Sequence, residues 1–174
     1  MIKRLQKRIK LNDAQTIRNL GCYYESGING LPQNRDKALE LWRRAAELGD
    51  PTAYFNIGIA YKNGINVKKD EKKAIHCWEL AAIGGDSKAR HNLGAFEELA
   101  GNNHRALKHY IIAVEGGEHI SLKKIRGLYT NGHATKEDYA KALRSYQECL
   151  DEIKSDQRDE VAATGEYKYY ESAF

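Results

Sequence analysis

The stretch that decides the fold is AYFNIGIAYKNGINVKKDEKKAIHCWELAAIGG, residues 53–85. In its second half Ala74, Trp78 and Ala81 follow one another at a spacing that puts all three on one face of a helix. The first half carries Gly58 between apolar residues that also have helical spacing. A glycine within a helix costs about 1 kcal/mol relative to alanine, so Gly58 indicates a close approach by a second helix. The stretch therefore predicts a hairpin of two packed helices.

The same pattern recurs along the chain. A basic residue followed by alanine stands at 37–38, 73–74, 105–106 and 141–142, at spacings of 36, 32 and 36 residues. Residues that favour strands or break helices are few, with three valines, five threonines and two prolines among 174 residues. The sequence therefore predicts an all-α chain of about four tandem helix hairpins. An aromatic residue follows each alanine by four positions and a small residue by seven: Trp42, Trp78, Tyr110 and Tyr146, then Ala45, Ala81, Ala113 and Cys149.

These spacings also set the expected organisation of the chain. We place repeat 1 at residues 14–50, repeat 2 at 51–86, repeat 3 at 87–117 and repeat 4 at 118–153. Repeat 3 is shortened between its helices, and repeat 4 is expected to have a long second helix. Residues 1–13 predict a basic capping helix before the first repeat. Residues 154–174 are charged and then rich in tyrosine, and we expect part of this tail to be disordered.

The pattern Leu-Gly-x-x-Tyr, a loop glycine, Lys-Ala, an aromatic residue and Ala-Ala-x-x-Gly resembles the Sel1-like repeat, a relative of the tetratricopeptide repeat. Residues 53–85 match nearly every position, whereas Glu97 and Arg126 depart from the pattern. The resemblance implies a right-handed α-solenoid with terminal capping helices that serves as a scaffold for protein partners. The chain also resembles the repeat portion of proteins that join such repeats to a RING-type zinc domain. That domain is absent, because no Cys-x-x-Cys pair occurs here.

In such a solenoid the first helix of each hairpin lines a concave groove, where residues not needed for the core are candidates for partner binding. Asn19, Asn56 and Asn92 recur at one register, and their amides suit either an extended peptide backbone or the neighbouring hairpin. Phe55 and Ile59 are expected either to anchor a partner's side chain or to pack under the third repeat. The full set of predicted partner-binding residues is Arg18, Asn19, Phe55, Asn56, Ile59, His91, Asn92 and Lys123.

The sequence offers little support for an enzyme. The six histidines show no pairing at helical spacing, and the three cysteines are 55 and 72 residues apart, so we expect no metal site. Neither a dinucleotide-binding nor a Walker-type glycine motif occurs, and we expect no cofactor and no catalytic residues. A hydrolase, proposed for cysteine-rich relatives of this repeat, is not expected because their cysteines are missing. We interpret Cys22, Cys77 and Cys149 as reduced packing residues.

Charge and composition limit the partners. The net charge is only +4, and the basic residues near the N-terminus suit a capping helix better than nucleic-acid binding. No apolar stretch is long enough for a membrane span, and no signal peptide is recognisable, so a cytoplasmic or nuclear, non-secreted monomer is expected. The sequence therefore predicts a non-catalytic scaffold or adaptor for a peptide or protein partner. The alternative is a substrate-recognition or assembly part of a ubiquitin-ligase complex whose catalytic domain lies outside this chain.

Overall fold

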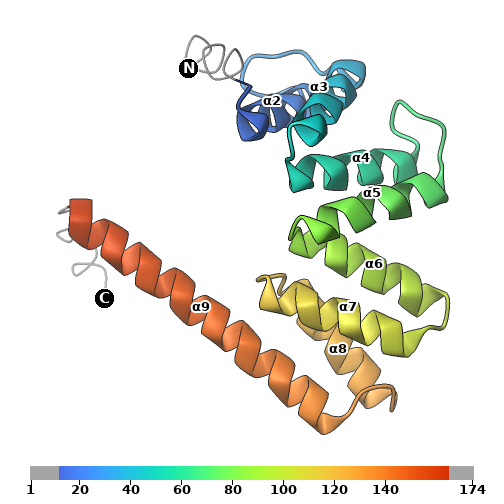
Figure 1. Ribbon diagram of the computed structural model, residues 1–174, viewed down its shortest axis with the longest axis vertical. Helices are drawn as coiled ribbons and strands as arrows, with labels where there is room; N and C mark the ends of the chain where they lie inside the picture. Colours follow the sequence, from blue (N-terminus) through green and yellow to red (C-terminus); the bar gives the residue numbers. More distant parts are fainter. Residues whose placement is uncertain (1–11, 165–174) are drawn as a thin grey trace.

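The structure is a computed structural model that describes residues 12–164, with side chains described as far as residue 156. Within these residues every regular element is an α-helix, and successive helices pack as antiparallel hairpins in a stack (Figure 1). The all-α solenoid expected from the sequence is thereby confirmed. The helices are α2 (Ala14–Ser26), α3 (Arg35–Glu47), α4 (Pro51–Asn63), α5 (Glu71–Ile83), α6 (Ser87–Leu99), α7 (Asn103–Glu115), α8 (Ile120–Thr130) and α9 (Lys136–Thr164).

Short polar residues define where the helices of the first repeats begin. Asp50 lies before α4 in an extended conformation, and its carboxylate accepts a hydrogen bond from the Ala53 backbone N–H. This cap satisfies one of the backbone donors that a helix N-terminus leaves unpaired. Asp86 caps α6 through the Ala89 N–H in the same way. Similar caps begin α2, α3 and α5, at Asp13, Asn34 and Asp70.

Within a hairpin, the glycine of the first helix receives the aromatic ring of the second. A Cβ atom on Gly58 would lie 2.4 Å from the indole nitrogen of Trp78, a distance that no side chain tolerates. Only glycine therefore lets the two helices approach this closely. The same contact joins Gly21 to Trp42, where the distance would be 2.6 Å, and Gly94 to Tyr110, where it would be 2.8 Å.

Three apolar clusters join the hairpins into one solenoid. Each contains the second helix of one hairpin and the first helix of the next, so α3 packs on α4, α5 on α6 and α7 on α8. Because most packing joins consecutive helices, the core is a continuous column rather than a central globule. The residues at its centre include Trp78, Tyr110, Ile17, Ile125 and Val114, all at most 2% exposed.

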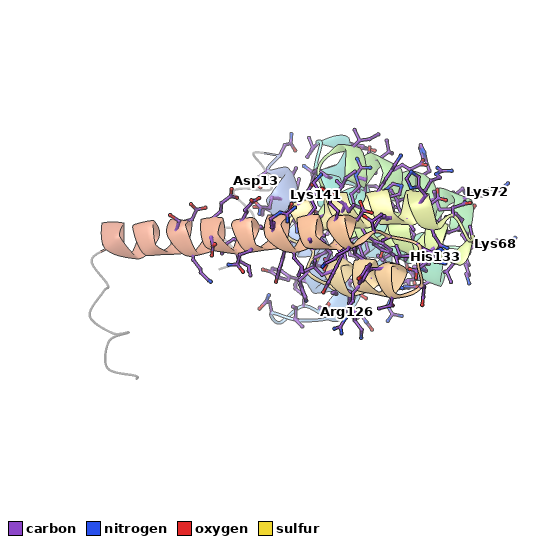
Figure 2. The ribbon with its side chains drawn as sticks, turned by 90° about the horizontal axis from the view of Figure 1, so that it is seen from below. Asp13, Lys68, Lys72, Arg126, His133 and Lys141 are labelled. Carbon is purple, nitrogen blue, oxygen red and sulfur yellow. The ribbon has the colours of Figure 1, made fainter. Side chains whose placement is uncertain are left out.

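Helix α9 is much longer than the others, with 29 residues against 13 in α7. The second helices α3, α5 and α7 each stop next to a glycine with positive φ, namely Gly49, Gly85 and Gly117. At the equivalent position α9 has Ile153, and the helix continues to Thr164. Residues 154–164, the charged first part of the expected tail, continue this helix, because no glycine or proline ends it earlier. Figure 2 shows α9 extending well beyond the stack.

The connections differ between hairpins. Only residues 100–102 separate α6 from α7, whereas residues 27–34 join α2 to α3 and residues 64–70 join α4 to α5. The longer loops turn through left-handed residues at their asparagines, Asn29 and Asn66. Residues 1–11, for which a capping helix is expected, and the tyrosine-rich residues 165–174 lie outside the described part of the chain.

Candidate functional site

The predicted partner-binding residues occupy equivalent positions on the first helix of each hairpin. Arg18, Phe55, His91 and Lys123 each precede by two residues a core residue, Leu20, Ile57, Leu93 or Ile125, and we call these four the variable row. Asn19, Asn56 and Asn92 follow them directly, and we call these three the asparagine row. Helices α2, α4 and α6 each carry one residue of both rows, and α8 carries Lys123 of the variable row.

At the first junction, Arg18 is an ion-pair partner. Its Nε lies 2.9 Å from Oδ2 of Asp50, the capping residue of α4, and the two side chains are 18% and 8% exposed. Its Nη1 donates a hydrogen bond of 2.9 Å to Oδ1 of Asn19. Asp50 therefore serves two roles at once, with one carboxylate oxygen capping α4 and the other holding α2. Arg18 and Asn19 are held in fixed geometry by the stack itself.

At the second junction a residue of the asparagine row contacts a neighbouring repeat. The Asn56 amide donates to Sγ of Cys22 over 3.5 Å, which links α4 back to α2. Thr52 donates to Oδ2 of Asp86 over 2.9 Å and links α4 forward to the cap of α6. Asn56 thus contacts the preceding repeat directly, whereas Asn19 accepts from Arg18 of its own helix, which forms the ion pair with Asp50. Peptide binding by the asparagine row stays a prediction.

Phe55 and Ile59 are half-buried and pack against the cluster that joins α5 to α6. Trp78, Ala89 and Leu93 belong to that cluster. The structure therefore places these two side chains at the edge of the core, with part of each surface still accessible. Their role as anchors for a partner's side chain stays a prediction.

At the third junction, polar groups from three helices meet. His91 of α6 has its Nδ1 2.8 Å from Oγ of the fully buried Ser121 of α8, and its ring centroid lies 5.5 Å from that of Tyr110. Burial lowers the pKa of His91, with smaller opposing contributions from Glu118, which raises it, and Lys124, which lowers it. The uncharged imidazole is therefore favoured in this setting.

Glu98 forms a second group of polar contacts at the same junction. Tyr110 donates to its Oε2 over 2.6 Å, and Lys124 approaches the same oxygen at 3.0 Å. Burial by itself raises the pKa of Glu98, but these hydrogen bonds and the charge of Lys124 outweigh it and leave the pKa below its ordinary value. Burial together with Glu98 raises the pKa of Tyr110. The junction is held by a charged, hydrogen-bonded carboxylate.

The fourth position of the rows differs from this pattern. Lys123 is exposed, and it is the next residue, Lys124, that reaches the preceding repeat. Asn92 is half-buried. The residues that the sequence reasoning omitted are the acceptors at the junctions, above all Asp50 and Asp86. The recurrence of Gly-Asp at 49–50 and 85–86 is the signal that identifies them, since a capping aspartate keeps one oxygen for another donor.

The described residues give no support for a reactive thiol, a metal site or a membrane-spanning helix. Cys22, Cys77 and Cys149 are half-buried free thiols, and burial raises the pKa of Cys77, which disfavours its reactive thiolate. Between residues 12 and 164, no group of histidine, cysteine, aspartate and glutamate is arranged to hold a metal ion. No helix in the same range combines the length and apolar character that crossing a membrane would need.

Several curated proteins are similar to short parts of this chain. DAP3-binding cell death enhancer 1 of Rattus norvegicus is 30% identical over 76 residues, which is 42% of this chain and 15% of that protein. The ERAD-associated E3 ubiquitin-protein ligase component HRD3B of Arabidopsis thaliana is 38% identical over 55 residues, 32% of this chain and 9% of that protein. The chain thus spans only a small fraction of the length of these relatives.

Two solved structures share the fold over most of the chain. A Sel1 repeat protein from Oxalobacter formigenes superposes with a TM-score of 0.73 at 29% identity, covering 86% of this chain and 63% of that one. The c5321 protective antigen of uropathogenic Escherichia coli, which has an SLR fold, gives a TM-score of 0.72 at 25% identity, covering 87% and 33%. Both similarities extend through most of the stacked hairpins.

The family model of the Sel1 repeat matches four segments, residues 14–50, 51–86, 87–118 and 127–147. These segments together make up well over half of the chain. Proteins of this kind generally act as non-catalytic scaffolds for protein interaction. The geometry of the hairpins, the glycine and aromatic contacts within them and the matched segments agree: the chain belongs to the Sel1 repeat family.

Proposed function

We propose that the chain is a non-catalytic adaptor that binds a peptide or protein segment along the groove lined by α2, α4, α6 and α8. The observation that carries the proposal is the contrast between constant and variable positions on those helices. Ile57, Leu93 and Ile125 at one position are apolar and at most 6% exposed. Two residues earlier the variable row changes from Arg18 to Phe55, His91 and Lys123. A scaffold that keeps its core and varies its surface is suited to recognition.

The chemistry of the variable row indicates what such a partner offers. Phe55, with Ile59 one turn later, provides an apolar area in the second repeat. Lys123 is exposed and is one charge in the row that no described ion pair neutralises. An apolar side chain near repeat 2 and an acidic group near repeat 4 would match this distribution. Interface energy is concentrated in few residues, and these two positions are where we expect it.

Affinity capture from lysate of the source cells, followed by binding assays with the purified captured protein, tests the proposal. We expect Lys123→Glu to weaken binding by about tenfold, which corresponds to about 1.4 kcal/mol, because the reversed charge would repel an acidic group of the partner. Lys72→Glu is the matched control, since Lys72 is an equally simple exposed lysine on α5, a second helix (Figure 2). Equal loss of binding in both variants, or in neither, would place the recognition surface outside the groove.

Phe55→Ser examines the apolar part of the groove. Because Phe55 also packs on the core, the unfolding free energy of this variant must be measured beside its affinity. A fall in affinity at a temperature where the variant is fully folded supports an anchor. A loss of stability with unchanged affinity would reduce Phe55 to a packing residue.

A second proposal is that the partner belongs to a ubiquitin-ligase complex. It is favoured by the 38% identity over 55 residues to HRD3B, which is by name a component of such a ligase. The chain would then recognise substrate or assemble subunits, while the catalytic domain is in another protein. Captured material that ubiquitinates a substrate in the presence of E1 and E2 enzymes would support this role. If partners are captured but show no such activity, the proposed adaptor function stands and the proposed ligase association is contradicted.

A further inference from the structure

His91 is the residue of the variable row whose charge can change near neutral pH. One of its ring nitrogens is fixed by the fold, because Nδ1 lies 2.8 Å from Oγ of Ser121. The other ring nitrogen, Nε2, forms no hydrogen bond with the described residues and is not one of the buried atoms left without a partner, so solvent reaches it. Ser121 is fully buried, so it positions the ring and cannot itself attack a substrate.

His109 of α7 has the opposite arrangement. It is also half-buried, but its Nδ1 is a buried atom that has no hydrogen-bond partner among the described residues. Burial lowers the pKa of both histidines. His109 lies on a second helix, outside the groove lined by α2, α4, α6 and α8. The two residues are therefore similar in burial and different in position, which makes His109 a matched control for His91.

The other titratable groups around His91 are Glu98 on its own helix, Tyr110 of α7, Glu118 in the connection before α8 and Lys124 of α8. Burial alone would raise the pKa of Glu98, but hydrogen bonds from Tyr110 and Lys124 keep it below its ordinary value. Burial together with Glu98 raises the pKa of Tyr110. Glu98 and Tyr110 therefore keep their protonation states between about pH 5 and pH 8, and the charge of His91 is the one that changes.

Two exposed lysines neighbour His91 on the helices that line the groove. Lys88 stands one turn before it on α6, and Lys123 has the same repeat position on the next first helix, α8. Neither lysine forms an ion pair with a residue that the structure describes, whereas Lys124 is paired with Glu98. The groove thus presents two uncompensated positive charges and one titratable imidazole in repeats 3 and 4.

We infer that an acidic segment of the partner binds at His91 and Lys123, and that this binding is proton-linked, tighter at about pH 5.5 than at about pH 7.5. The inference rests on the proposed function, because it assigns a partner class and a regulation to the same groove. A carboxylate beside Nε2 favours the imidazolium over the imidazole, so binding is accompanied by uptake of a proton. The gain in affinity reaches at most about tenfold for each pH unit by which that carboxylate raises the pKa of His91.

A rhodamine-labelled hexaglutamate peptide is the probe, with hexaglutamine as the uncharged control. Its affinity for the purified full chain, measured by fluorescence anisotropy, should rise about fivefold from about pH 7.5 to about pH 5.5 in the wild type and in His109→Gln. His91→Gln should show little change. His91→Lys should bind at about pH 7.5 nearly as tightly as the wild type does at about pH 5.5, because its charge is permanent. Arg18 and Lys123 show that this position accepts a cation.

NMR provides a second readout. The imidazole signal that is missing from His91→Gln should titrate about one pH unit higher when hexaglutamate is bound, while the signal of His109 should keep its midpoint. Circular dichroism at each pH checks that every variant is folded.

Four results would overturn the inference: no binding of hexaglutamate at either pH, equal wild-type affinity at both, a pH dependence that survives in His91→Gln, or one that His109→Gln removes equally. The proposed function is tested separately, with the captured partner and Lys123→Glu. If that variant weakens binding of the captured partner while hexaglutamate shows no proton linkage, the adaptor function stands and the role of His91 is excluded.

Discussion

In repeat 2 the Trp78 ring lies so close to Gly58 that a Cβ atom there would be 2.4 Å from the indole nitrogen. In repeat 4 Arg126 stands at the glycine position, and a Cβ on Gly127 would meet no atom within 4 Å. The aromatic residue of repeat 4, Tyr146, is accordingly only half-buried. The comparison teaches that the glycine and the ring depend on each other: where the notch is lost, the ring is no longer enclosed.

The largest effect that separates the two repeats should come from removing the rings. Trp78→Ala leaves a large cavity at a side chain that is 2% exposed, and we expect a loss of about 3–5 kcal/mol in unfolding free energy. Tyr146→Ala removes a half-buried ring and should cost clearly less. Urea unfolding followed by circular dichroism measures both. Equal losses would show that repeat 4 is packed as tightly as repeat 2.

The next largest effects are expected from replacing the glycines of the two repeats, and the two changes in unfolding free energy should have opposite signs. Gly58→Ala forces a methyl group into the Trp78 ring and should destabilise the chain by about 1–3 kcal/mol. Gly127→Ala meets open space within α8 and should stabilise it by up to about 1 kcal/mol through helix propensity. Thermal unfolding of both variants beside the wild type gives the two signs. A stabilised Gly58→Ala protein would contradict the close approach of the two helices.

A smaller effect is expected at the cap that joins repeats 1 and 2. Asp50→Ala removes the cap of α4 and also the ion pair with Arg18, for a loss of about 2 kcal/mol. Asp70→Ala removes the cap of α5, whose ion pair with Lys73 is exposed, and should cost about 1 kcal/mol. Denaturant unfolding compares the two. If the losses match, the Arg18 contact adds nothing to the stacking of the repeats.

The smallest effect concerns pH at the junction between repeats 3 and 4. Since burial lowers the pKa of His91 in the folded chain, the unfolded chain binds more protons below its pKa of about 6.5. Stability should therefore fall as the pH drops from about 6.5 towards the lowered pKa, and His91→Gln should remove part of that fall. Melting temperatures at about pH 7.5 and pH 5 test this. Identical acid sensitivity in both proteins would assign the effect elsewhere.

His109→Gln is the natural control for that experiment. Burial also lowers the pKa of His109, and the charge of Arg90 contributes to the same direction. His109 lies on α7, outside the pair that His91 forms with Ser121. The two variants together divide the acid sensitivity between the junction and the second helix of repeat 3.

The sequence was sufficient for the fold because the repeat residues act locally. Ala74, Trp78 and Ala81 had to share one helical face, and all three are buried. The contacts of the variable row were not predictable in the same way. Arg18 meets Asp50, 32 positions later, only through the angle at which two hairpins stack, and no pattern in either helix contains that angle. The apolar stripe that ends at Ile153 predicted a long second helix in repeat 4, but the continuation of α9 to Thr164 was not predicted, because it depends on the absence of a stop signal after that stripe.

The serial packing of the helices has a mechanical consequence. Each helix contacts chiefly those before and after it in the chain, so tension applied to the two ends passes through the junctions one after another. Every junction then carries the same load, and the weakest yields first. The weakest junction is the one between α8 and α9, because Tyr146 is only half-buried and a Cβ atom on Gly127 would meet no atom within 4 Å. A chain stretched from its ends is therefore expected to unravel first at repeat 4, before the hairpins in which Trp42, Trp78 and Tyr110 are buried.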